Sequence, residues 1–351
     1  MGGGVALAAC GDSRDDADDA AADGGTEGGS DAESAAPEGG QELTEVSQFE
    51  LTDEQAEDIR GRGLRFGFLI NNIADDFSST LAASGEQHAE LCGIEIDVQS
   101  GDFDANRQLT QFNALVQQEV DGIFLTAVDA ASIGTAVVRA NDAGIPVFIV
   151  GGPPGQGEVI SVMNAASYDG CREAGDALMA AIGEPNAQVA VLGIPLALQT
   201  IRDREKGILD AIGAASGQVV SLQSDFSQDT LLALATNVIQ ANPDLRGIFA
   251  TWSLAVNATI EAVAQSGRDI FFAGYDSEAT GYEQFAAGNT NLVALSGQQA
   301  FLQGRVAIEG LCQVILGNTL APEIITPNLL VTADNYEESW ATQYPETPPP
   351  F

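Results

Sequence analysis

Positive charge, histidine and long apolar runs are scarce in this sequence. Its 351 residues hold 13 lysines and arginines against 51 aspartates and glutamates, and the formal net charge is −38. Nucleic acid is therefore not expected as a partner, because phosphate binding needs clustered cations. The sequence has no stretch of about 18 consecutive apolar residues, so no segment is expected to cross a membrane as a helix.

The residues that build catalytic or metal centres are also missing. The one histidine, His88, falls in the middle of an expected helix, where we predict a solvated surface position. It has no serine or cysteine partner at a recognisable spacing, so a catalytic triad is not supported. Without a Cys-x-x-Cys pair or a His/Cys cluster, a zinc site is not expected either. We predict no cofactor, no metal and no enzymatic reaction.

Acidic residues are in excess along the whole chain. Residues 1–63 contain 17 acidic and 3 basic side chains, and residues 64–351 contain 34 and 10. We interpret the excess as a feature of solubility or of a salty habitat, with attraction of a cationic ligand as the alternative. Self-repulsion is expected to weaken the fold at low salt.

The amino-terminal string Leu7-Ala8-Ala9-Cys10 resembles a bacterial lipobox. The resemblance implies that residues 1–10 end a signal peptide and that Cys10 carries a lipid; a chance match is the alternative. Residues 1–9 have no basic residue and little apolar length, so we expect the true start to lie upstream. The acidic, Ala- and Gly-rich sequence that follows predicts a flexible tether over residues 11–63.

Three further cysteines, Cys92, Cys171 and Cys312, are spread over the rest of the chain. We expect them to be small buried residues. One disulfide with one free thiol stays open, because the connectivity cannot be read from a sequence.

Strand and helix patterns alternate from Leu64 onward. Short apolar runs at 64–70, 93–98, 121–127 and 146–150 alternate with helical spacings, and Asp104 and Gly144 are expected to cap two of these helices. The rhythm restarts after 158–163 and continues to a strand at 292–296, a long helix at 301–316 and a last strand at 328–333. The pattern predicts an α/β fold with two lobes, each a parallel sheet covered by helices on both faces.

Four strings in this order carry a family resemblance: "DGIFLTAVDAASIGTAVVRANDAGIPVFIV", "IRDREKGILDAI", "NPDLRGIFATWSLA" and "FFAGYDSEATG". From Leu64 to Ala333 the chain resembles the periplasmic sugar-binding proteins of the ribose-binding type, which share their fold with lactose-repressor-like ligand domains. The resemblance implies a type I periplasmic binding protein: two Rossmann-like lobes, 64–165 plus 298–327 and 166–297 plus 328–335, followed by a tail at 336–351. The three crossings would lie near Asn164–Ser167, Ser296–Gln298 and Pro327–Leu329.

The resemblance also implies ligand-binding positions in a cleft between the lobes. Arg202 would read hydroxyl groups, Phe226 would cover a sugar face, and Asp276 would accept two hydroxyl hydrogens. The full set carried over is Asn72, Asp76, Phe77, Arg202, Phe226, Asp276 and Gln298.

Two positions depart from the ribose pattern. Gly151 and Gly152 stand where the ribose type has Asp-Arg, and Trp252 stands where it has an asparagine. We expect the glycines to leave room in the cleft, with backbone N–H groups that bind a ligand oxygen, and Trp252 to line it. Ribose itself is therefore doubtful, and another sugar, a polyol or a nucleoside-like ligand is open.

The two resemblances together imply an extracytoplasmic, lipid-anchored solute-binding protein of an ABC importer for sugars, which passes its ligand to a membrane permease. A receptor that presents the ligand to a membrane signalling protein is the alternative. A DNA-binding regulator is rejected, because residues 11–50 are acidic where such a protein needs a basic DNA-binding motif.

Overall fold

The computed structural model describes residues 40–193, 199–224, 227–345 and 347–351. Cys10, expected to carry the lipid, and Phe226, expected to cover a sugar face, lie outside these residues. Within the described part of the chain, no helix is long and apolar enough to cross a membrane.

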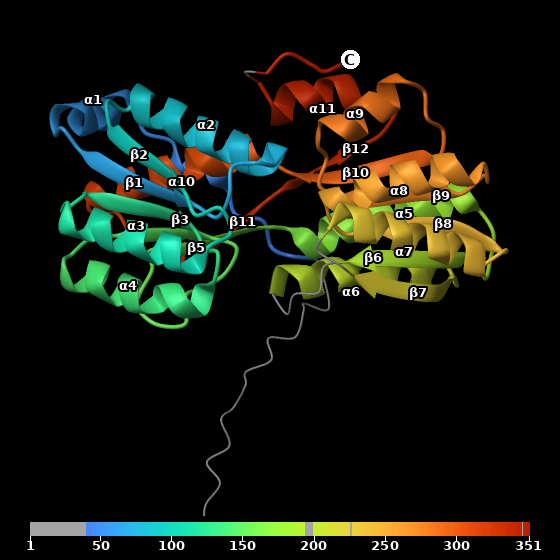
Figure 1. Cartoon of the computed structure of the whole chain (residues 1–351). Coiled ribbons are helices and arrows are strands. Elements are labelled where there is room, and N and C mark those ends of the chain that lie inside the picture. Colours follow the sequence, from blue (N-terminus) through green and yellow to red (C-terminus); the bar gives the residue numbers. More distant parts are fainter. Residues whose placement is uncertain (1–39, 194–198, 225–226, 346) are drawn as a thin grey trace, which may run out of the picture. The chain divides into compact units, whose positions relative to one another are not determined.

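The first lobe is built on a six-stranded sheet in the order β11-β5-β4-β3-β1-β2 (Figure 1). All of its strand pairs are parallel. Its central strands are buried on both sides because their apolar residues are continuous rather than alternating. The strands are β1 (Arg65–Ile70), β2 (Glu95–Ser100), β3 (Gly122–Thr126), β4 (Val147–Val150), β5 (Ser161–Ala165) and β11 (Glu323–Thr326).

Two helices cover each face of this sheet. Helices α2 (Asp76–Leu91) and α10 (Ala300–Ile315) pack over a core that includes Phe66, Phe68 and Phe148. Helices α3 (Ala105–Gln117) and α4 (Ala130–Asp142) pack on the opposite core, around residues such as Phe112. As predicted, the Asp104 side chain accepts from two backbone N–H groups at the start of α3. Gly144, after α4, has a positive φ of 73° that suits a glycine at a helix end.

The second lobe repeats the plan with the strand order β12-β10-β9-β8-β6-β7. Its strands are parallel except β12, which runs antiparallel to β10 at the edge. They are β6 (Gln188–Gly193), β7 (Gln218–Ser224), β8 (Leu245–Ala250), β9 (Phe271–Tyr275), β10 (Leu292–Gln298) and β12 (Asn328–Val331). The helices are α5 (Ser167–Ile182), α6 (Gln199–Ala214), α7 (Gln228–Ala241), α8 (Ser253–Ser266), α9 (Ala279–Ala286) and α11 (Tyr336–Gln343).

The chain passes from one sheet to the other at three places. It leaves the first sheet after β5, returns from β10 into α10, and passes directly from β11 to β12. The predicted two-lobed α/β fold with parallel sheets and three crossings is confirmed.

The expected tether to residue 63 is wrong over its second half. A short 3-10 helix, η1 (Val46–Phe49), and helix α1 (Asp53–Gly61) are folded against the first lobe, where Phe49 and Ile59 are buried in its core. Thr52 and Gln55 form a reciprocal capping box that starts α1. The composition predicted a tether because Phe49 and Ile59, the two buried apolar residues, are separated by a stretch rich in acidic residues.

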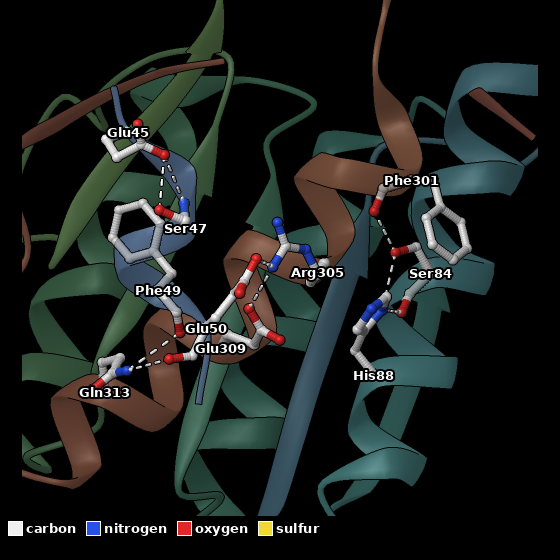
Figure 2. Close-up of polar contacts among 10 residues, drawn as sticks. All are labelled: Glu45, Ser47, Phe49, Glu50, Ser84, His88, Phe301, Arg305, Glu309 and Gln313. Atoms are coloured by element: carbon white, nitrogen blue, oxygen red, sulfur yellow. Dashed lines mark hydrogen bonds and ion pairs between the residues drawn. The ribbon is translucent and has the colours of Figure 1, made fainter. Parts of the chain in front are cut away.

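His88 is half-buried rather than solvated at the surface. Its Nδ1 donates to the Ser84 carbonyl over 2.8 Å, and its ring packs edge-on against Phe301 at 5.4 Å between centroids (Figure 2). Burial lowers the pKa of His88 below its usual value, mainly because the charged imidazolium loses its hydration. The histidine therefore belongs to the contact between α2 and α10.

Candidate functional site

Asp276 lies at the carboxyl end of β9, the edge of a parallel sheet where ligands of such folds bind. Its backbone has a φ of 69°, and its N–H donates to the Ser296 carbonyl of β10 over 2.8 Å. One carboxylate oxygen accepts from Gln298 Nε2 at 3.2 Å, and the other lies 3.4 Å from Arg204 Nη1. The carboxylate is thus held from two sides while 16% of the side chain stays exposed.

Arg204 is the cation buried beneath this carboxylate. Its Nη1 also donates to the Thr251 carbonyl over 3.0 Å, and its guanidinium carbon lies 4.0 Å from the centre of the Tyr275 ring. Its Nε is buried and has no hydrogen-bond partner among the described residues. Burial works to lower the pKa of Arg204, but the charge of Asp276 raises it above its usual value, so the guanidinium stays charged.

The arginine predicted from the family resemblance, Arg202, has a different environment. It is exposed on the first turn of α6 and donates to Gln199 Oε1 over 2.8 Å. Arg204 was not predicted from the sequence, although the helical spacing of its neighbours indicates a buried position. It lies three residues after Ile201 and four before Ile208, both buried, so all three share one face of α6.

The loop after β1 holds Asn72 inside its own hydrogen bonds. The Asn72 amide donates to Asp75 Oδ2 over 2.8 Å and its oxygen accepts from the Ala74 N–H over 2.8 Å, and the side chain is buried. Asp75 in turn caps α2 by accepting from the Ser78 N–H over 2.7 Å. Phe77 is partly buried against the core of the first lobe.

Asp76 connects the two lobes. Its Oδ2 accepts a hydrogen bond of 2.9 Å from the Ala279 N–H at the start of α9. The neighbouring Glu278 is half-buried. Its pKa is raised to about 8, first by burial and then by the negative charges of Asp276, Asp76 and Asp75.

The two glycines after β4 face open space. A Cβ added at Gly151 or Gly152 would meet no atom within 4 Å, although Gly151 has a φ of 103° that a side chain would strain. The Gly151 N–H donates to the Met163 carbonyl over 3.0 Å, so the expectation that it would bind a ligand oxygen is wrong. The sheet uses this donor to pair β4 with β5.

Trp252 follows β8 and precedes α8. Its ring is partly buried against the apolar core of the second lobe, and its indole Nε1 has no partner in the described part of the chain. Of the predicted residues, the structure brings Asp276 and Gln298 into direct contact, and it joins Asp76 to α9, whose start follows Asp276 by three residues.

The carboxyl-terminal segment supports the loop that carries Asp276. Ser277 donates to Gln343 Oε1 over 2.7 Å, and Tyr344 donates to the Ser277 carbonyl over 2.8 Å. Trp340 and Tyr344 pack their rings on Tyr282 of α9, with centroids 5.0 and 6.2 Å away. The sequence analysis predicted a tail over residues 336–351 and did not predict these contacts of Trp340, Gln343 and Tyr344, which are called the C-terminal brace below.

Chemically, the cluster offers a fixed carboxylate, a buried guanidinium and an amide, which suit neutral ligands with several hydroxyl groups. In the part of the chain that the structure describes, no three His, Cys, Asp or Glu side chains are grouped so that they could hold a metal ion.

A family model described as the periplasmic binding protein domain matches residues 66–319. The chain belongs to this family. Curated relatives of this periplasmic binding protein match it over most of their own length. The ribose import binding protein of Bacillus subtilis is 28% identical over 268 residues, which are 76% of this chain and 86% of that protein. The ribose import binding protein of Escherichia coli is 24% identical over 71% of this chain and 84% of its own.

Solved structures share the fold of this periplasmic binding protein. An ABC transporter solute-binding protein from Actinobacillus succinogenes with bound D-allose has a TM-score of 0.72 and 21% identity, covering 78% of this chain and 99% of its own. A solute-binding protein from Mycobacterium smegmatis with bound glycerol has a TM-score of 0.71 and 21% identity, covering 79% and 96%. At these identities the likeness concerns the fold.

Proposed function

We propose that this periplasmic binding protein captures a sugar or a related polyhydroxylated molecule between its lobes and delivers it to the permease of an ABC importer. The observation that carries the proposal is the carboxylate of Asp276, held between Arg204 and Gln298 with its edge still accessible. A relative that binds ribose by its name, and neighbours solved with D-allose and glycerol, support the ligand class.

The chemistry of the site favours hydroxyl groups over charged ligands. A carboxylate already paired with a guanidinium keeps lone pairs that accept two O–H donors, and such charge-assisted bonds are short and directional. Gln298 can then donate or accept beside it. The apolar C–H face of a sugar would lie on an aromatic ring, for which we propose Trp252, Phe77 and Phe226.

The proposed mechanism is hinge closure. The ligand binds to the open form, and the lobes rotate about the three crossings until groups from both lobes contact it. Closure requires that the ligand bind the closed form more tightly than the open one. The bond from the Ala279 N–H to Asp76 is one contact between the lobes that we expect to strengthen closure.

The two glycines and Trp252 set the specificity in this proposal. Open space at Gly151 and Gly152 leaves room for a ligand that differs from ribose, and the exposed Arg202 of α6 would supply a donor to it. We therefore propose a larger sugar, a polyol or a nucleoside-like solute as the ligand, bound without any chemical reaction.

The cellular setting is part of the proposal. Members of this family work outside the cytoplasm, and the lipobox-like sequence ending in Cys10 supports attachment of this protein to a membrane by a lipid. Mass spectrometry of the membrane fraction would test the anchor. A diacylated Cys10 at the mature amino terminus is expected, and an unmodified Cys10 would contradict it.

A thermal-shift screen tests the binding function. Sugars, polyols, nucleosides and amino acids are added in millimolar excess, and a ligand that binds only the folded state raises the melting temperature by mass action. We expect a shift from at least one sugar or polyol and none from amino acids. Shifts confined to amino acids or other charged solutes would contradict the proposal.

A further inference from the structure

Two of the three buried cysteines lie in the same core of the first lobe. Cys92 ends α2 as its C-cap residue, and Cys312 lies in the last turn of α10. Their exposed fractions are 6% and 0%, and both belong to the apolar cluster between these helices and the sheet. Cys171 is buried in the second lobe, in a separate cluster.

The packing of α2 on α10 brings the two cysteines into register. Both helices lead into parallel strands of one sheet, so they run in the same direction. They approach closely at Ser84 and Gly304, where a Cβ on the glycine would lie 2.6 Å from the serine Cβ. Figure 2 shows the same approach at Ser84, whose hydroxyl donates to the Phe301 carbonyl over 2.5 Å.

From that close approach, each cysteine lies eight residues further along its helix. Cys92 follows Ser84 by eight positions, and Cys312 follows Gly304 by eight. Equal steps of about 1.5 Å per residue along two helices of the same direction keep the residues level with each other. The two thiols accordingly lie near each other in this core, where the proximity of Cys312 lowers the pKa of Cys92 and that of Cys92 raises the pKa of Cys312.

We propose that Cys92 and Cys312 form a disulfide that joins α2 to α10, and that Cys171 stays a thiol. A family that works outside the cytoplasm meets the oxidising conditions in which disulfides persist. The bond would close a loop of more than 200 residues across the first crossing and back, and so tie the two ends of this lobe together. This inference concerns the stability of the first lobe and does not depend on the ligand.

The reaction needs an external disulfide as oxidant, such as an oxidised thiol–disulfide oxidoreductase or oxidised glutathione. The Cys92 thiolate attacks one sulfur of the oxidant, whose S–S bond breaks and releases a first thiolate. Cys312, after losing its proton, attacks the Cys92 sulfur of the mixed disulfide and releases the second thiolate. Two protons and two electrons thus leave the protein in two reduced thiols. The order follows from the two pKa shifts: the interaction with Cys312, helped by the charge of Arg60, lowers the pKa of Cys92, while the interaction with Cys92 and burial raise that of Cys312.

Peptide mapping of the full chain tests the pairing. The protein is refolded from denaturant in a mixture of reduced and oxidised glutathione, alkylated, and cleaved after arginine. Cys92, Cys171 and Cys312 then fall on separate peptides, 66–107, 140–172 and 306–351, and Cys10 falls on a fourth, 1–14. We expect 66–107 joined to 306–351, two hydrogens lighter than the free pair, and 140–172 alkylated. Alkylation of both 66–107 and 306–351, or any link that includes Cys171 or Cys10, would overturn the proposal.

Melting of oxidised and reduced protein tests the structural effect. We expect the oxidised chain to melt about 5–10 °C higher than the chain kept in a reductant. Cys171→Ser should keep that difference, whereas Cys92→Ser and Cys312→Ser should each lose it. Equal melting of oxidised and reduced wild-type protein would contradict the joining of α2 to α10.

Discussion

Ser277 donates a hydrogen bond of 2.7 Å to Gln343, a residue 66 positions further along the chain. The same amide oxygen lies 3.1 Å from the Tyr282 hydroxyl, and Gln343 Nε2 donates to the Ser277 carbonyl over 3.2 Å. Because Ser277 directly follows Asp276, the end of the chain fixes the backbone on which the proposed ligand carboxylate stands. The brace makes α11 part of the site although none of its side chains is proposed to touch the ligand.

Gln343→Ala removes this brace. We expect the free energy of unfolding to fall by about 1–3 kcal/mol, because buried partners lose their hydrogen bonds, and ligand affinity to fall by roughly tenfold. Denaturant unfolding and calorimetric titration measure the two effects. Glu338→Ala, on the exposed side of the same helix, is the control and should change neither. Unchanged affinity in Gln343→Ala would show that α11 does not position Asp276.

Alanine variants of the two arginines of α6 should differ in their effects on stability and on ligand binding. Arg204→Ala leaves Asp276 without its buried partner and should lower the free energy of unfolding by about 3–5 kcal/mol. Arg202→Ala removes an exposed side chain and should change stability by less than about 0.5 kcal/mol, while weakening ligand binding by about tenfold or more. Urea unfolding and titration of both variants decide the assignment. A ligand affinity that survives in Arg202→Ala would remove this residue from the site.

Gly152→Trp tests the open space after β4. No atom lies within 4 Å of the position of its Cβ, and its φ is not in the positive range, so the variant should fold with a melting temperature close to that of wild type. The large ring should fill the space that the ligand needs and abolish the thermal shift by the ligand. Val138→Trp, an exposed position on α4, serves as the control. Full ligand response in Gly152→Trp would place the ligand elsewhere.

Glu278 should make stability fall as the pH rises. Its pKa is about 8 in the folded protein against 4.5 ordinarily, so the folded state binds the extra proton between these values. Stability from this group is complete below about pH 4.5 and is lost as the pH rises through about 8. Glu278→Gln mimics the protonated form and keeps the size of the side chain.

Measured at pH 9, Glu278→Gln should be more stable than wild type by on the order of 3 kcal/mol, and at pH 4.5 the two should be nearly equal. Glu283→Gln, exposed on the same helix, should follow wild type at both pH values. Parallel stability profiles of Glu278→Gln and wild type between pH 4.5 and 9 would contradict the raised pKa.

The two lobes and the three crossings could be predicted from the sequence, because strands and helix ends are indicated by short local patterns. Continuous apolar strands such as Phe66–Ile70 and helix ends such as Gly144 depend on short patterns. Strand β11 was missed because it has only four residues after Pro322, and its pairing with β5 is a tertiary fact. Helix α1 was missed because Ile59 is the one buried residue in a highly charged segment.

The candidate site could be predicted only where a residue directly ends a strand. Asp276 and Gln298 follow or end neighbouring strands, so the sequence already places them together. The role of Arg204 depends on the ring of Tyr275, which ends β9, and on the carbonyl of Thr251, which directly follows β8. The contact of Gln343 with Ser277 depends on how α11, which follows the last strand, packs on the second lobe. No local sequence pattern predicts that packing.

The most direct measurement is calorimetric titration of wild type and Asp276→Asn with the sugar or polyol that gives the largest thermal shift. Asparagine tolerates the φ of 69° and keeps the shape of the side chain, so the charge is lost and one acceptor oxygen becomes an NH2 donor. We expect a one-to-one complex with wild type and a Kd at least about 100-fold weaker in Asp276→Asn, because two charge-assisted hydrogen bonds are weakened. Equal affinity in the two proteins would contradict the central claim that this carboxylate holds the ligand.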